Sequence, residues 1–239
     1  MEAINKLLKV NMKLMMRRLD VRVCAALGII LAIFEAAVSK HTDTLDWYGM
    51  FEMLIMFAFI LSAVGGLFIS RDYSLNTIRN KLTVGHKRTS VYLANQIAES
   101  IFFCIPVMIY FITSVIADLI LIGAKGAKPS DIIMNIAVAL FAMIALSALT
   151  TFISMTVKNS AGGVIPLITF YPMLMLAAVT QELELKESTL NLINSIPIPQ
   201  LTILFEPDKD AAMHILSSIA ITVVFTFAGT ALFRRSDLK

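Results

Sequence analysis

The chain has 239 residues, of which 58% are hydrophobic and only 15% are charged, and its mean hydropathy is +0.80. A soluble domain usually carries about 25% charged residues, and the apolar residues here form long continuous runs. The composition therefore excludes an ordinary soluble domain and predicts an all-α polytopic membrane protein, with residues 1–239 as one transmembrane domain. Continuous runs also argue against an outer-membrane barrel, whose strands alternate polar and apolar residues.

Residues 1–20 combine apolar and basic side chains at helical spacing, which predicts an amphipathic helix lying in the membrane interface. The alternative is an ordinary positive flank before the first span. The apolar positions are Ile4, Leu7, Leu8, Met12, Met15 and Leu19, and the basic ones are Lys6, Lys9, Lys13, Arg17 and Arg18.

Six apolar runs follow, each long enough to cross a membrane, which needs about 20 residues. The third and fourth runs are longer than that, so we expect them to tilt or to extend beyond the lipid. The runs cover residues 22–39, 51–69, 93–122, 131–157, 163–180 and 211–233.

A seventh apolar segment, residues 189–206, contains Pro197 and Pro199 near its middle. Each proline removes a helical hydrogen bond and clashes with the preceding turn. We therefore expect a broken, re-entrant or surface-lying hairpin in an extracellular loop over residues 181–210. Such backbone is tolerated at membrane depth only where protein or a watery cavity covers it.

The distribution of charge predicts the topology. With six spans, one side of the membrane carries fifteen of the 20 Lys and Arg residues, and the other side carries five. The positive-inside rule then places both termini and the 70–92 loop in the cytoplasm. We expect a multi-pass protein of the bacterial cytoplasmic membrane.

The chain lacks the motifs of common catalytic sites. It has no Gly-rich loop ending in Gly-Lys-Ser/Thr, no Gly-x-Ser-x-Gly and no His-Glu-x-x-His. We therefore expect no enzymatic activity and no catalytic, cofactor-binding or metal site in this chain. The alternative metal site would combine His41 and His214 with Asp43, Asp46 or Glu52, but solvated loop side chains explain these residues more simply.

Acidic residues inside apolar runs are costly and mark functional candidates. Glu35 lies deep in the first run and is a candidate for lining a translocation cavity. Glu99 lies about a third of the way into the third run, where pairing with an Arg or Lys is the expected role. Glu52 and Asp118 lie near the outer ends of their runs.

The 70–92 loop has the pattern of a short amphipathic helix. Asp72 and Ser74 are residues that open helices, and Gly85 is suited to end one. Leu75, Ile78 and Leu82 share one face, with basic residues on the others. A helix this short is marginal by itself, so a partner groove that takes its apolar face would stabilise it.

These features together resemble the six-span permease subunits of type-2 ABC exporters, the group that includes bacitracin- and lantibiotic-resistance permeases. The resemblance covers essentially the whole chain. It rests on the basic N-terminus, Arg71-Asp72-Tyr73, Thr77-Ile78-Arg79-Asn80, Gly85, the segment Ile196-Pro197-Ile198-Pro199-Gln200 and the Phe233-Arg234-Arg235 ending. Family members often carry Glu where this chain has Asp72, so the carboxylate is kept.

The resemblance implies a function and partners. Two permease chains, identical or related, would pair with two separate ATPase subunits that bind ATP and Mg²⁺, and would export an amphipathic substrate such as a peptide antibiotic, a drug or a lipid. The loop would be a coupling helix that docks on the ATPase. Its implied docking residues are Asp72, Tyr73, Leu75, Thr77, Ile78, Arg79 and Leu82.

Two other functions remain open. A membrane immunity or sensor protein could bind a toxic cationic peptide through the acidic outer loop, using Glu182, Glu184 and Glu187. A stand-alone intramembrane enzyme would have to depend on Glu35 or Glu99. The substrate itself is not identified by the sequence.

Overall fold

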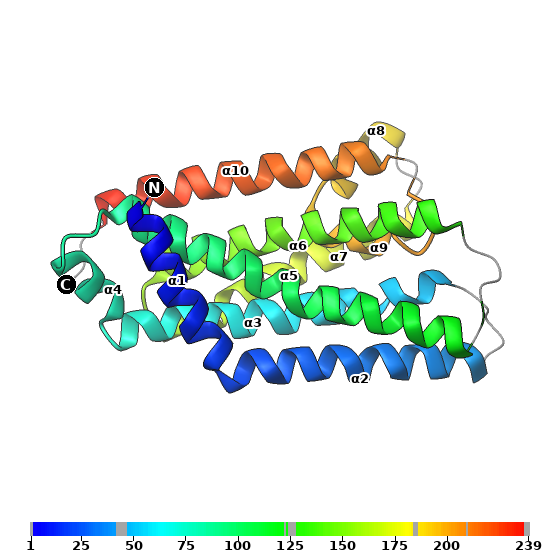
Figure 1. Cartoon of the computed structure of the whole chain (residues 1–239). Coiled ribbons are helices and arrows are strands. Elements are labelled where there is room, and N and C mark those ends of the chain that lie inside the picture. The colour runs from blue at the N-terminus through cyan, green and yellow to red at the C-terminus, as the bar shows by residue number, and fades with distance from the viewer. Residues whose placement is uncertain are drawn as a thin grey trace.

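The computed structural model describes residues 2–41, 47–121, 123, 128–183, 186–208 and 210–236, and every regular element within them is a helix. Long helices run side by side along one axis, and α1 crosses them obliquely (Figure 1). The elements are α1 (Glu2–Arg17), α2 (Leu19–His41), η1 (Trp47–Phe51), α3 (Met53–Ser74), α4 (Thr77–Thr83), α5 (Arg88–Leu121), α6 (Pro129–Val157), η2 (Ser160–Gly163), α7 (Ile165–Glu182), α8 (Glu187–Asn194), α9 (Pro197–Thr202) and α10 (Ala211–Arg235).

Six helical segments of the described chain are long and apolar enough to cross a membrane, which confirms the predicted number of spans. Two are longer than a bilayer requires, because α5 has 34 residues and α6 has 29, whereas about 20 suffice. The six segments are Leu19–Lys40, Trp47–Ser74, Arg88–Leu121, Pro129–Val157, Ala161–Thr180 and Ala211–Arg235.

The two ends of the bundle carry different short elements. The beginning of α1, the helix α4 and the C-terminal end of α10 lie at one end, which we call the α4 end (Figure 1). Helix α8 and the beginning of α10 lie at the opposite end, which we call the α8 end (Figure 1). Because the chain begins and ends at the α4 end, the long helices run from one end of the bundle to the other an even number of times, as six spans require.

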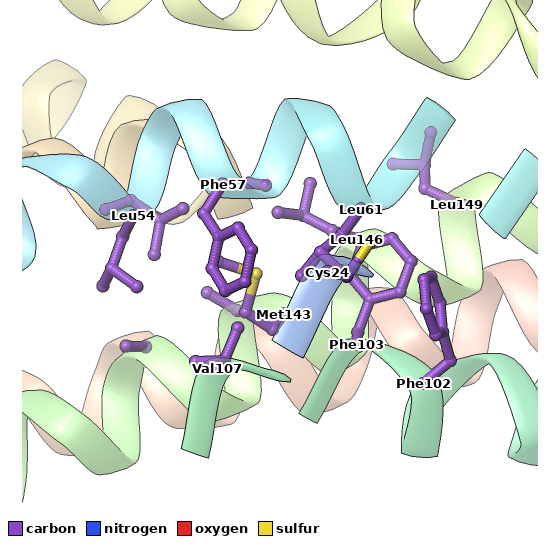
Figure 2. Close-up of a cluster of buried hydrophobic side chains, with 14 of the residues drawn as sticks. Cys24, Leu54, Phe57, Leu61, Phe102, Phe103, Val107, Met143, Leu146 and Leu149 are labelled. Carbon is purple, nitrogen blue, oxygen red and sulfur yellow. The ribbon is translucent and has the colours of Figure 1, made fainter. Parts of the chain in front are cut away.

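Helix α6 runs through the middle of the bundle and packs against α3, α5, α7, α9 and α10. Figure 2 shows a cluster of buried hydrophobic side chains contributed by α2, α3, α5 and α6. In lipid, such helices associate through close van der Waals packing rather than through the hydrophobic effect. The labelled cluster consists of Cys24 from α2, Leu54, Phe57 and Leu61 from α3, Phe102, Phe103 and Val107 from α5, and Met143, Leu146 and Leu149 from α6.

Glycines bring the α3 backbone against η2. A Cβ atom on Gly66 would lie 2.9 Å from the carbonyl oxygen of Gly162 and 3.0 Å from the Cα of Gly163. Ser154 of α6 donates a hydrogen bond of 2.7 Å to the same Gly162 carbonyl. Any side chain on Gly66 would therefore force α3 away from η2, so these glycines allow the two elements to pack closely.

The proline-containing segment is not one continuous helix, as expected. Helix α8 ends at Asn194, and α9 begins at Pro197. The role of the prolines differs from the prediction, because they start a helix rather than interrupt one. Both Pro197 and Pro199 lie in the first turn of α9, where a missing N–H leaves no helical hydrogen bond unmade.

Candidate functional site

The helix boundaries in the 70–92 loop differ from the prediction. Asp72 and Ser74 do not open the short helix, because α3 continues without a break to Ser74. The chain then turns at Asn76, whose backbone is left-handed (φ 55°), and α4 begins at Thr77. Asp72 and Tyr73 therefore belong to the last turn of a spanning helix rather than to α4. Asparagine tolerates the left-handed region better than most residues, which explains the turn at this position.

Gly85 ends α4, as predicted. Its φ of 97° is open to glycine but strained for other residues. The N–H of Gly85 donates to the carbonyl of Leu82 at 3.0 Å, and the N–H of His86 donates to that of Lys81 at 3.2 Å. This pair of hydrogen bonds satisfies carbonyl groups at the end of the helix in the manner of a Schellman cap.

A chain of polar side chains fastens α4 to three other helices. The Nζ of Lys81 lies 3.0 Å from Oδ2 of Asp72 on α3 and 3.0 Å from Oδ1 of Asn11 on α1. The Nδ2 of Asn11 in turn donates to Oδ1 of Asn95 on α5 at 2.7 Å. The side chains of Lys81 and Asp72 are only 10% and 14% exposed. Helices α1, α3, α4 and α5 are thus joined by four residues.

The predicted apolar face of α4 is divided between the bundle and the outside. Ile78 is 1% exposed and belongs to the buried core, and Leu82 packs against that core. Leu75 instead precedes α4 and is 66% exposed. The bundle itself therefore occupies most of the face that the sequence assigned to a partner.

What α4 presents outward is a different set of residues. Leu75 and Val84 are large apolar side chains that are 66% and 81% exposed, and Arg79 and Lys87 are exposed cations on the same short stretch. We call these four residues the α4 rim. Exposed apolar groups flanked by exposed cations are typical of a protein-binding surface.

Two further contacts fix the surroundings of α4. The hydroxyl of Tyr73 donates to the carbonyl of Met155 on α6 at 3.0 Å. The guanidinium of Arg88, at the start of α5, donates to the carbonyl of Phe233 at 3.2 Å and also hydrogen bonds to the carbonyl of Ser236. A cation at the C-terminal end of α10 also suits the negative end of the helix dipole.

Helix α1 packs against α5 with a face that includes one polar residue. Leu7, Asn11 and Met15 follow each other at intervals of four residues, and all three are buried. The predicted apolar face is wrong at Leu19, which belongs to α2 and is exposed. On the outer side of α1, Val10 and Leu14 are exposed.

At the α8 end, Gln200 pins α9 to α10. Its Nε2 donates to Oγ of Ser217 at 2.8 Å and to the carbonyls of Ser195 and His214 at 3.0 and 3.2 Å. Its Oε1 accepts a hydrogen bond of 2.7 Å from Oγ of Ser218. Every residue of Pro197–Leu201 is buried, so these bonds are made away from water.

Asn135 holds the segment that follows α9. Its Nδ2 donates to the carbonyls of Leu204 and Glu206 at 3.1 and 2.8 Å, and its Oδ1 accepts from the N–H of Asp208 at 3.2 Å. The carboxylate of Asp208 lies 2.7 Å from Nδ1 of His214. His214 is thus engaged within the α8 end.

Glu35 lies in α2 under the η1 turn. It is 5% exposed, and its Oε1 accepts a hydrogen bond of 2.9 Å from Ser39. A Cβ atom on Gly49 would lie 2.5 Å from the same oxygen, so the η1 backbone covers the carboxylate closely. The role of Glu35 in a translocation cavity stays a prediction.

Glu99 is fully buried in α5, and its carboxylate fills the space that Gly65 of α3 leaves open. Within the described part of the chain, neither carboxylate oxygen of Glu99 has a hydrogen-bond partner. The direct pairing with an Arg or Lys that the sequence suggested is therefore not found there. The absence of a side chain on Gly65 leaves the space that this carboxylate occupies.

No group of three or more His, Cys, Asp or Glu side chains that could hold a metal ion is present among the residues with described positions. Asp43 and Asp46, two of the alternative carboxylates of the metal site, lie outside the described residues, as does Glu184 of the acidic outer loop, and the side chains of His41 and Glu182 are not described.

Sequence reasoning missed Asn11, Lys81, Asn95, Asn135 and Gln200 as structural anchors. One signal could have found Asn11, because an amide lies on the helical stripe of Leu7 and Met15. The others have no such signal, because their partners are backbone groups or residues distant in the chain.

Comparison with models of known protein families finds no match, and comparison with curated protein sequences finds none either.

Proposed function

We propose that this chain is the transmembrane subunit of an ABC exporter, working with a second permease chain and with separate ATPase subunits. The observation that carries the proposal is the α4 rim. It is an exposed apolar and basic surface formed by α4 and the residues that flank it, outside the long apolar segments, and the Asn11–Lys81–Asp72 contacts join α4 to α1 and α3. A coupling helix has to be both accessible to a partner and firmly attached to spanning helices.

The charge distribution supports a cytoplasmic α4 end. When six spans are assumed, the sequence assigns fifteen of the 20 Lys and Arg residues to the side of the membrane that would hold α4. Both termini and the ATPase partner would then share the cytoplasmic side. The exposed Val10 and Leu14 on α1 suit a helix that lies in the inner membrane interface.

Helices α8 and α9 would form the extracellular re-entrant hairpin. Helix α9 is buried among α3, α6 and α7, which supports this role because irregular backbone at membrane depth must be covered by protein. The exit for the substrate would lie beside this hairpin. The substrate would be amphipathic: a peptide antibiotic, a drug or a lipid.

The transport cycle follows from this assignment. ATP binding closes the two ATPase subunits, and the α4 rim carries that displacement to the bundle. Because α3 runs unbroken from Met53 to Ser74, its end beside α4 cannot move independently of its membrane segment. The chain supplies the pathway, and the ATPase supplies the free energy.

The experiment that tests the proposal uses Leu75→Glu and Val84→Glu in the full chain, coexpressed with a candidate ABC ATPase subunit from the same genome. Both side chains are exposed, so the chain should still fold. We expect loss of copurification with the ATPase, and loss of substrate-stimulated ATP hydrolysis. Ile78→Asp would be a poor test, because Ile78 is buried and the charge would unfold this region.

The matched control is Leu192→Glu, because Leu192 is 72% exposed on α8 at the opposite end. It should leave copurification intact. If Leu75→Glu and Val84→Glu also retained a fully stimulated ATPase, the coupling role of α4 would be refuted. Nucleotide-independent activity of the purified chain that requires Glu35 or Glu99 would instead favour an intramembrane enzyme, and peptide binding without transport would favour an immunity or sensor protein.

A further inference from the structure

A groove of about 570 Å³ lies between α2 and α3 at the α4 end. One wall is the first part of α2, including Val23 and Leu27, and the other is α3 from Ile60 to its end, including Val64. Arg18 and Arg71 stand at the same end of the groove, one just before α2 begins and one in the last turn of α3. The groove is therefore apolar along its length and cationic at its mouth.

The charged mouth has an excess of positive charge. Arg18 donates two hydrogen bonds to a single oxygen of Asp20, with an Nε–Oδ2 distance of 3.1 Å, and its guanidinium lies 5.1 Å from the ring centroid of Phe68. Arg71 is exposed, and its guanidinium has no ion pair or hydrogen bond with the described part of the chain. Asp20 thus offsets one of the two cations, and the mouth suits a ligand with one negative charge.

The length of the apolar walls matches one leaflet. From Arg18 to Leu27 the chain advances nine residues, and from Arg71 back to Ile60 it advances eleven, which at 1.5 Å per residue gives about 14 and 16 Å. The hydrocarbon core of a bilayer is about 30 Å thick. A molecule with its anionic head at the two arginines would therefore reach approximately to the middle of the membrane.

We propose that this groove binds one anionic phospholipid of the leaflet that faces the α4 end, with the phosphate between Arg18 and Arg71 and an acyl chain along α2 and α3. The site holds the head group and the upper part of the lipid, and the rest of the chains stay in the bilayer. An anionic lipid fits because the charge is at one end only and the apolar part continues into the membrane. The binding site needs no ATPase and no transport activity.

The test uses the full purified chain in nanodiscs of phosphatidylcholine containing a minor fraction of phosphatidylglycerol. The lipid that remains bound after extraction is quantified by native mass spectrometry, and thermal stability is measured across the same lipid series. We expect selective retention of phosphatidylglycerol. Arg71→Gln should lower its apparent affinity about fivefold, since a basic residue near an anionic lipid surface contributes about 1 kcal/mol.

Two matched pairs of variants separate this site from general membrane attraction. Arg79→Gln removes another exposed cation, on α4 outside the groove, and should leave retention unchanged. Val23→Trp fills the apolar part of the groove and should abolish retention. Ile30→Trp makes the same change two turns further along α2, beyond the groove residues, and should retain the lipid.

Four results would overturn the proposal. These are equal retention of phosphatidylcholine, equal effects of Arg71→Gln and Arg79→Gln, unchanged retention in Val23→Trp, and retention of no lipid at all by the wild-type chain. Glycerol 3-phosphate is added in a further series as a head group without chains. If it displaced phosphatidylglycerol at similar concentration, the apolar walls would contribute nothing and the site would be a simple anion site, which also contradicts the proposal.

Discussion

The two ends of the bundle attach their short helices, α9 and α4, to the long helices with different kinds of side chain. At the α8 end, neutral amides tie α9 and the following segment to α6 and α10, and Gln200 makes four hydrogen bonds in a fully buried position. At the α4 end, a charged pair between Lys81 and Asp72 holds α4, and both side chains remain slightly exposed. Helix α9 is thus buried within the protein, whereas α4 is attached to the bundle and partly exposed.

At the α4 end, the side chains that attach α4 to the bundle are different from those exposed on its outer surface. The residues that attach α4, namely Ile78, Lys81 and Leu82, face the bundle, whereas Leu75 and Val84 face outward. Substitutions can therefore distinguish the two roles at the α4 end. In α9 attachment and burial coincide, so substitutions in Pro197–Leu201 should act on stability.

The largest expected effect tests whether α10 and α5 pack rigidly at the α4 end. A Cβ atom on Gly229 of α10 would overlap the hydroxyl of Tyr92 on α5, and Tyr92 is fully buried beside Phe233. We expect Gly229→Ala to lower the free energy of unfolding by about 3 kcal/mol through overpacking. Equilibrium unfolding in mixed micelles measures this value.

Gly28→Ala serves as the control for Gly229→Ala. Its new methyl group would lie 3.3 Å from its nearest neighbours, so a small displacement accommodates it. Equal effects of the two substitutions would mean that the contact of Tyr92 with Gly229 is not rigid.

The sealed character of the α8 end predicts a large effect of Gln200→Leu. The substitution leaves the carbonyl of Ser195 and the hydroxyls of Ser217 and Ser218 without their amide partner. Because a buried unsatisfied group costs free energy, we expect a loss of about 2 kcal/mol in the same unfolding measurement. Gln96→Leu is the matched control, since Gln96 is also buried but donates only to Ser100 one turn away, and a comparable loss there would contradict the special role of Gln200.

A smaller effect is expected at the charged attachment. Lys81→Met leaves Asp72 and Asn11 without their shared donor, and the slight exposure of the pair reduces the cost to about 1 kcal/mol. Lys87→Met, on an exposed residue of the same loop, should change stability by much less. Adding Asp72→Asn to Lys81→Met should restore part of the loss, and a double-mutant cycle with no coupling would show that the ion pair does not hold α4.

The smallest effect concerns the α4 rim. Leu75→Ala should change the free energy of unfolding by less than about 0.5 kcal/mol, because the side chain is mostly exposed. The same variant should weaken binding of the ATPase. A large loss of stability without any change in binding would reverse the assignment and make Leu75 an attachment residue.

The sequence predicts the number of helices well because each span is a continuous apolar run. It is less informative where a helix continues past the apolar residues. Helix α3 was expected to stop near Ile69, but it extends to Ser74 because Ser70 is buried and Tyr73 hydrogen bonds to Met155 of α6. These contacts join residues that are 82 positions apart, and periodicity carries no information about them.

Of the predicted apolar face of α4, Ile78 and Leu82 face the bundle, whereas Leu75 lies before the helix and is exposed. Periodicity shows that Ile78 and Leu82 share a face, and it does not show whether that face meets a partner chain or the rest of the same chain. The position of Lys81 between Asp72 and Asn11 decides this orientation. Asn135 and Gln200 escaped prediction for a related reason, since most of their partners are backbone carbonyls that any sequence would supply.

Leu75 has a consequence for energetic coupling across this end of the molecule. It lines the groove between α2 and α3, and it is also one of the exposed residues beside α4. A molecule in the groove and a protein on α4 would therefore touch the same side chain, and their equilibria would be linked. By thermodynamic reciprocity, the factor by which the groove ligand changes the affinity for the protein on α4 equals the factor by which that protein changes the affinity for the groove ligand. The lipid composition of the membrane would then enter the binding constant of the partner directly.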